Sequence, residues 1–143
     1  MKLIDVYEEY KEKYKDYIII INSGIFYNVY NLDTNILYTL LKYKIKKSST
    51  YYVVGFPINN LGKVLETLKQ NNINYIVLDK DSNNRFYISD KYKDKNNSYS
   101  KYEIDIERMN YIDNRIKRIQ EILESKKFEN NIETILFQIE KLL

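Results

Sequence analysis

Short apolar runs alternate with amphipathic segments over the first 88 residues of the chain. The run YIIIIN at residues 17–22 is almost wholly apolar and rich in β-branched side chains, which is typical of a strand buried on both faces. Three segments carry apolar residues at spacings of three and four, and we predict helices there: 5–15, 34–43 and 60–70. The other strands that we predict are 25–30, 44–47, 51–56, 75–78 and 85–88.

After the first helix, the predicted order is β-β-α-β-β-α-β-β. This order indicates an α/β fold, with an α+β arrangement in which helices flank a mixed sheet. We place this domain at residues 1–89. Hydrophobic residues make up 44% of the chain, which is enough to build a core.

The pattern changes after the sheet domain. Residues 90–102 are polar and basic with few apolar side chains, and we predict a mobile linker there. Residues 103–143 return to spacings of three and four, which predicts a hairpin of two helices at about 103–125 and 129–142. The apolar stripes of these helices comprise Ile106, Met109, Ile112, Ile116, Ile119 and Leu123, then Ile132, Ile135, Ile139 and Leu142.

The two apolar stripes allow two arrangements. The hairpin packs back on the sheet domain, or it associates with a second copy. A two-helix hairpin does not bury two apolar stripes well by itself, and the linker favours a semi-independent unit. We therefore expect a homodimer joined through residues 103–143.

The composition excludes several chemistries. The chain has no Cys and no His, so it holds no disulfide, no Cys/His zinc site and no catalytic triad with histidine as the base. Carboxylates at Asp79, Asp81 and Asp90 surround a predicted hairpin, and turn formation explains them better than a two-metal site. We expect neither an enzyme nor a cofactor or metal.

The charge is unevenly distributed. Residues 1–102 carry 16 Lys/Arg and 11 Asp/Glu, a net charge of +5, whereas residues 103–143 carry 7 and 9, a net charge of −2. A basic body fits a polyanionic partner such as DNA, and ordinary surface charge explains it equally well. No apolar run is long enough to span a membrane, and the N-terminus does not read as a signal peptide, so we expect a cytoplasmic protein.

The stretch INSGIFYNVY places bulky side chains directly after a predicted turn at Ser23-Gly24. The motif Gly24-Ile25-Phe26-Tyr27-Asn28-Val29-Tyr30 resembles the Gly-x-Phe-Tyr-Glu motif, with an aromatic residue two positions on, of the first domain of MutS-type DNA mismatch repair proteins. Asp33 and Gly55-Phe56-Pro57 match later positions of that domain. The resemblance covers about residues 6–80 and suggests a stand-alone, divergent form of this mismatch-recognition domain.

The resemblance implies roles for particular residues. In the family, the Phe wedges into the duplex from the minor groove and stacks on the mispaired base, and the Glu hydrogen-bonds that base. Phe26 would then be the stacking residue and Asn28 its polar neighbour, although Phe26 also fits a core or partner-contacting position. Lys44, Lys46 and Lys47 would contact the DNA backbone, or they form an ordinary solvated surface.

The chain departs from the family pattern at several positions. Asn28 replaces the Glu, Asn22 stands where Arg is usual, and Asn59 stands where His is usual. The sequence contains no Gly-rich loop ending in Gly-Lys-Ser/Thr, and we expect no connector, lever or clamp of the MutS kind. The leading hypothesis is a non-catalytic nucleic-acid-binding module. The alternative is a protein-interaction or scaffolding module that keeps the fold and has lost DNA binding.

Overall fold

The computed structural model describes residues 2–102 and 106–143, except for the side chains of Ile106, Glu107 and Met109. The predicted start of the first hairpin helix, at 103–105, therefore lies outside the described residues, as do the side chains of the predicted stripe positions Ile106 and Met109. The chain divides into two compact units, Met1–Ile104 and Asp105–Leu143.

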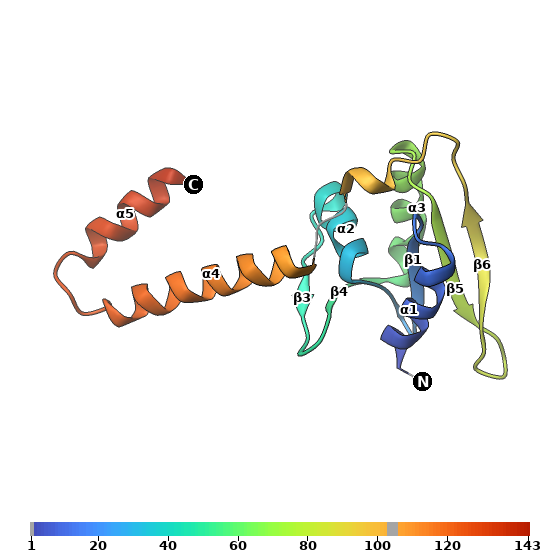
Figure 1. Ribbon diagram of the computed structural model, residues 1–143, viewed down its shortest axis with the longest axis horizontal. Helices are drawn as coiled ribbons and strands as arrows, with labels where there is room; N and C mark the ends of the chain where they lie inside the picture. Colours follow the sequence, from blue (N-terminus) through green and yellow to red (C-terminus); the bar gives the residue numbers. More distant parts are fainter. Residues whose placement is uncertain (1, 103–105) are drawn as a thin grey trace. The chain divides into compact units, whose positions relative to one another are not determined.

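The first unit is built on a six-stranded mixed sheet in the order β3-β4-β2-β1-β5-β6 (Figure 1). The strands are β1 (Ile18–Ser23), β2 (Phe26–Tyr30), β3 (Lys46–Lys47), β4 (Tyr52–Pro57), β5 (Tyr75–Lys80) and β6 (Phe86–Tyr92). β1 and β5 are parallel, and every other neighbouring pair is antiparallel. The predicted α/β fold with a mixed sheet is confirmed.

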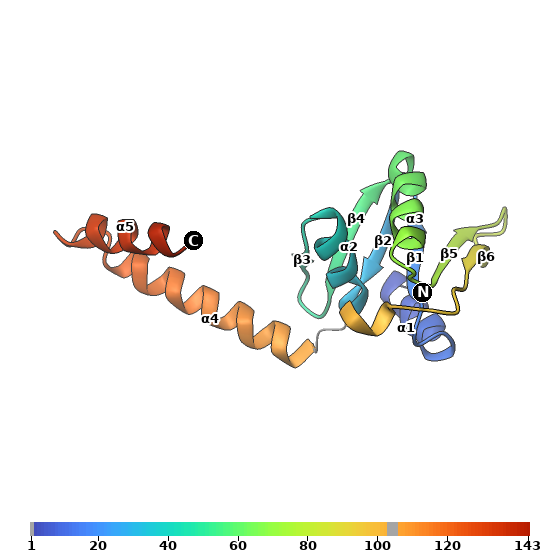
Figure 2. The ribbon, with the colours of Figure 1, turned by 90° about the horizontal axis from the view of Figure 1, so that it is seen from above.

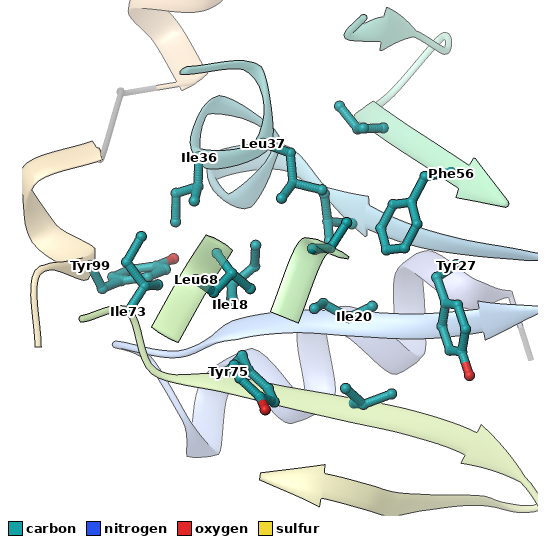
Figure 3. Close-up of a cluster of buried hydrophobic side chains, with 14 residues drawn as sticks. Ile18, Ile20, Tyr27, Ile36, Leu37, Phe56, Leu68, Ile73, Tyr75 and Tyr99 are labelled. Atoms are coloured by element: carbon teal, nitrogen blue, oxygen red, sulfur yellow. The ribbon is translucent and has the colours of Figure 1, made fainter. Parts of the chain in front are cut away.

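The helices α1 (Leu3–Lys13), α2 (Thr34–Leu41) and α3 (Leu61–Gln70) cover the two faces of this sheet. α1 packs through Val6 and Tyr7 on one face. α2 and α3 pack on the other face, where Ile36, Leu37 and Leu68 join the larger cluster of buried side chains (Figure 3). β1 lies between α1 and α3 (Figure 2).

The isoleucines of β1 explain why this strand is central. Ile18 and Ile20 belong to the cluster under α2 and α3, and Ile19 and Ile21 belong to the cluster under α1. All four are fully buried. Because side chains alternate across a strand, only an all-apolar run can be covered by helices on both faces.

The segment predicted to be a mobile linker has a different structure. Residues 90–92 complete β6, an edge strand whose side chains are largely exposed. Asn97 then binds the domain: its Oδ1 accepts from the backbone N–H of Asn74 at 3.1 Å, and its Nδ2 donates to the carbonyl of Asp16 at 2.8 Å. A short 3₁₀ helix, η3 (Tyr99–Tyr102), follows and buries Tyr99.

Tyr99 is buried because it reaches the carboxylate of Asp33, which is itself fully buried. Oδ1 of Asp33 accepts a hydrogen bond of 2.5 Å from the hydroxyl of Tyr99 and one of 2.9 Å from Nζ of Lys11. Oδ2 accepts one of 2.9 Å from the backbone N–H of Ile19. Burial, together with the nearby Asp33 and Tyr99, raises the pKa of Tyr7 far above its usual value, so its hydroxyl stays neutral beside this carboxylate.

The second unit contains α4 (Ile106–Ser125) and α5 (Ile132–Leu142). The predicted pair of C-terminal helices is confirmed. Leu123 of α4 and Ile132 and Leu136 of α5 line a common cavity. Ile112, Ile116 and Ile119 remain 37%, 50% and 50% exposed. Among the described helices of both units, none combines the length and apolar character that a membrane span requires.

Replacing Tyr99 with Phe should lower the free energy of unfolding by about 2 kcal/mol, because the substitution removes a hydrogen bond to a buried charged group. Urea denaturation measures the change. Tyr38→Phe is the matched control: Tyr38 is 50% exposed, so its substitution should change stability by less than about 0.5 kcal/mol. Equal effects of the two substitutions would contradict the role of Tyr99.

Candidate nucleic-acid interface

The β1–β2 turn presents Phe26 to solvent. Gly24 has a φ of +68°, a conformation that glycine adopts without steric cost. Phe26 and Tyr27 then start β2 and point to opposite faces. Tyr27 is buried in the core, whereas Phe26 is 43% exposed. One of the two bulky residues after the turn therefore stabilises the domain, and the other is accessible to a partner.

Tyr27 holds this turn in place. Its ring stacks on Phe56 with a centroid distance of 6.0 Å, and its hydroxyl donates to Oδ1 of Asp79 at 2.8 Å. Burial, reinforced by the bond to Asp79, raises the pKa of Tyr27 to about 12. The hydroxyl is consequently protonated at neutral pH and remains a donor.

Two isoleucines extend the exposed apolar surface around Phe26. Ile25 is 71% exposed and Ile58 is 43% exposed. The backbone N–H of Ile58 donates to the carbonyl of Ile25 at 3.0 Å, and Phe26 pairs with Pro57 in the sheet. Ile25, Phe26 and Ile58 are thus three exposed apolar residues at the same end of the β2–β4 pair, and we call them the apolar tip.

A groove of about 450 Å³ lies beside Phe26. Its lining includes four of the five predicted site residues, Phe26, Asn28, Lys44 and Lys46. Lys47 lies elsewhere: it follows Lys46 in β3, so it points to the opposite face, and its Nζ lies 5.6 Å from the centre of the Tyr52 ring.

Asn28 occupies its place because its partner in β4 is a glycine. Asn28 pairs with Gly55, and a Cβ atom at Gly55 would lie 2.8 Å from Oδ1 of Asn28. Nδ2 of Asn28 donates to the hydroxyl of Tyr30 at 3.1 Å. The carboxamide therefore lies over Gly55, at the wall of the groove.

The charge around the groove is one-sided. Residues 17–32 contain no charged residue, and residues 34–65 contain five lysines and no Asp or Glu. Asp33, between these segments, is fully buried and paired with Lys11 at 2.9 Å. No acidic side chain from residues 17–65 is therefore exposed near Lys44 and Lys46.

Sequence reasoning missed several residues of this surface. Ile25 belongs to the turn after β1 and Ile58 to the 3₁₀ helix after β4, and nothing in their local sequence indicates that they meet. Tyr43 and Asn60 also line the groove: Tyr43 follows α2, and Asn60 ends the short 3₁₀ helix Ile58–Asn60 before α3. The absence of acidic residues over 34–65 was a usable signal, because it marks the surface that a polyanion would meet.

The acidic residues near β5 and β6 have structural partners. Asp79 accepts from Tyr27 and Ser89, and Asp90 accepts from the hydroxyl of Tyr75. Oδ1 of Asp81 accepts from the backbone N–H groups that follow it in the turn. Across residues 2–102 and 106–143, no group of three or more Asp or Glu side chains is arranged to hold a metal ion.

The chain was compared with models of known protein families and with curated proteins. The family model described as MutS domain I matches residues 1–97. The chain belongs to the MutS domain I family. The sheet, the turn with Phe26 and the groove all lie within the matched region, and α4 and α5 lie beyond it. A search of curated proteins found no match.

Membership of the MutS domain I family relates the chain to a mismatch-recognition module. Domain I of MutS binds DNA and is not catalytic. The resemblance read from Gly24–Tyr30 and Gly55–Pro57 is thereby confirmed at the level of the family.

Gly55→Ala should destabilise the domain by about 1–3 kcal/mol, because the new Cβ forces the carboxamide of Asn28 to move. In an Asn28→Ala background the same substitution should cost less, and urea denaturation of the four proteins gives the coupling. Gly62→Ala is the control: nothing lies within 4 Å of its Cβ position, and alanine favours the helix, so stability should rise. Additive effects of Gly55→Ala and Asn28→Ala would contradict the contact.

Proposed function

We propose that this domain binds DNA at sites where the duplex is easily deformed. Phe26 stacks on a base, Asn28 is its polar neighbour, and Lys44 and Lys46, which line the same groove, contact the backbone. The observation that carries the proposal is the exposure of Phe26 in the apolar tip, beside a lysine-lined groove with no exposed acid from residues 17–65.

The chemistry of the apolar tip suits a wedge. Apolar side chains inserted between base steps cost a few kcal/mol in lost stacking, and a mismatch lowers this cost because its bases are already poorly stacked. Ile25 and Ile58 add apolar surface next to Phe26, and this surface would enter the groove of the DNA together with Phe26. Such a wedge senses deformability of the DNA and not its sequence.

Asn28 would contact the base differently from the Glu that the family pattern has at this position. A carboxamide donates or accepts a hydrogen bond, but it carries no charge. The domain therefore binds a distorted site with one neutral polar contact where the family pattern has a carboxylate. We propose recognition without an ATP-driven cycle in these 143 residues, which contain no Gly-rich loop ending in Gly-Lys-Ser/Thr.

We further propose that two copies associate through residues 103–143. The exposed stripe of Ile112, Ile116 and Ile119 supports this arrangement, because apolar stripes of this kind are rarely left in water. Association brings two basic domains together, and binding one DNA with both raises the avidity without any new contact.

The apolar tip also supports a second candidate function. Exposed Ile25, Phe26 and Ile58 would suit a protein partner as well as a base step, and Asn28 lacks the charge of the family's Glu. In this alternative the domain is a protein-interaction or scaffolding module. Binding to DNA distinguishes the two candidates.

Titration against matched duplex, mismatched duplex and single strands at two salt concentrations tests the proposed function. Affinity should fall steeply with salt, in proportion to the phosphates that lysines neutralise. Phe26→Ala should reduce the preference for mismatched duplex about tenfold, since one stacked base contributes about 1–3 kcal/mol. Phe128→Ala, at a 93% exposed Phe of the second unit, is the control and should change nothing.

The same titration decides whether the domain binds DNA. Folded protein that binds none of the DNAs at low salt would remove the DNA-binding proposal and favour the scaffolding alternative.

Light scattering tests self-association. The intact chain should have about twice its monomer mass of 17.4 kDa, and Ile116→Lys should restore the monomer because it places a charge in the exposed stripe. Asn114→Lys adds the same charge on an exposed position outside the stripe and should leave the dimer intact. A monomeric wild-type protein would exclude the dimer.

A further inference from the structure

The second unit has a groove of its own on one face of α4. Its volume is about 420 Å³, and its lining residues recur at spacings of three and four along the helix: Tyr111, Arg115, Arg118, Ile119 and Ile122. Ile119 is 50% exposed and Ile122 is 45% exposed, and both arginines are exposed. We call it the α4 groove. It combines an apolar surface with two positive charges.

A neutral group, the hydroxyl of Tyr111, holds one arginine of the α4 groove. Nη1 of Arg115 donates to this hydroxyl at 2.8 Å, and the guanidinium carbon lies 5.6 Å from the centre of the Tyr111 ring. Among the described residues, neither Arg115 nor Arg118 forms an ion pair with a carboxylate. Both positive charges are therefore available to acidic groups of another molecule.

The α5 helix of the same chain lies against other residues of α4. The cavity that the two helices share is lined by Leu123 and Glu124 of α4 and by Ile132 and Leu136 of α5, among others. Of the described α5 residues, none lines the α4 groove. The groove is therefore open to a second molecule.

The outward side of α5 carries the complementary groups. Glu133, Phe137 and Glu140 are spaced by four and three residues, so they share one face of the helix. Phe137 is 61% exposed, and both glutamates are exposed. Within the described part of the chain, neither glutamate forms an ion pair. A rise of about 1.5 Å per residue places the glutamates about 10 Å apart along the axis, with Phe137 between them.

Lys141 is the only basic residue of α5, and it lies next to this face. Its Nζ is 5.5 Å from the centre of the Phe137 ring. Lys141 is exposed and its side chain is long and flexible, so the ammonium group can remain in water when the ring is covered. The face of Glu133, Phe137 and Glu140 therefore stays acidic and apolar.

We propose that α5 of one copy docks in the α4 groove of a second copy. Phe137 fills the apolar part of the groove, and Glu133 and Glu140 pair with Arg115 and Arg118. Each copy supplies one groove and one α5, so the contact forms twice about a two-fold axis and the dimer closes. This inference rests on the proposed self-association and deepens it, because it names the surfaces that meet.

The chemistry of the α4 groove favours this occupant over a polyanion. Aromatic side chains in pockets and arginine–carboxylate pairs contribute strongly to protein–protein binding. A nucleic-acid phosphate would satisfy the arginines but would leave Ile119 and Ile122 in water. Ile119 also belongs to the exposed stripe of α4, so docking of α5 covers part of that stripe.

Charge reversal in the full chain tests the contact. One variant carries Arg115→Glu and Arg118→Glu, and the other carries Glu133→Arg and Glu140→Arg. Each variant alone places like charges across the contact, so its dimerisation should weaken about a hundredfold, measured by light scattering over a range of concentrations. An equal mixture of the two should form a heterodimer about as tight as the wild-type dimer, because both contacts again join opposite charges.

Lys117→Glu is the matched control for α4, since Lys117 is exposed, precedes Arg118 and does not line the groove. It should dimerise as the wild type does. Phe137→Ala should weaken dimerisation about tenfold, as expected for an aromatic anchor. Phe128→Ala, at a 93% exposed Phe, should leave dimerisation unchanged. Circular dichroism checks that every variant keeps its helices.

The outcomes separate this inference from the proposed self-association. Recovery of the dimer in the mixture supports the contact and shows that it joins two copies. A mixture that stays monomeric would overturn the proposal, and so would charge-reversal variants that dimerise like the wild type. In that second case, loss of the dimer in Ile116→Lys would leave association through the stripe standing. If the Arg115/Arg118 variant stays dimeric but loses affinity for DNA, the groove contacts nucleic acid instead. A monomeric wild-type protein would remove both proposals.

Discussion

The buried carboxylate of Asp33 is the constraint on which the first unit depends. Removing a carboxylate from water is very costly unless charged and polar donors replace the solvent. Lys11 of α1, the backbone of Ile19 in β1 and Tyr99 of η3 supply those donors. These three contacts join the N-terminal helix, the central strand and the segment after the last strand to one point. The domain therefore extends to η3, because without Tyr99 the carboxylate would lose one of its donors.

The same arrangement determines which side chains of β2 reach solvent. Ile19 is fixed by its bond to Asp33, and β1 pairs with β2 in a register that places Ser23 opposite Phe26 and Asn22 opposite Tyr27. A shift of one residue would exchange the faces and bury Phe26 in place of Tyr27. The bond from Tyr27 to Asp79 and its stacking on Phe56 favour the observed register. The exposure of Phe26 is thus a consequence of core packing as well as of the turn.

Sequence reasoning predicted the elements whose signal is local. The apolar run of β1 and the spacings in α2 and α3 each follow from a few consecutive residues. It missed the structure of residues 90–102, because a solvent-facing edge strand and a polar segment have similar compositions, and the partner of Tyr99 lies 66 residues away. The residues of the candidate site likewise divide into those with a local sequence signal and those whose position depends on the tertiary fold. Phe26, Asn28, Lys44 and Lys46 line one groove, whereas strand alternation separates Lys47, and Ile25 meets Ile58 only through the tertiary fold.

Asp33 affects both the stability of the fold and the charge of the proposed DNA-binding surface. It is the only acidic residue between Asp16 and Glu66, a stretch that contains the tip, the groove and five lysines. An exposed carboxylate at this position would lower the positive potential that a polyanion meets. Burial against Lys11 removes that effect and simultaneously holds β1 in place. The other acids of residues 2–102 lie on α1 and α3, in the turn before β1 and on or next to β5 and β6, so the β2–β4 half of the sheet is the side on which DNA would be least repelled.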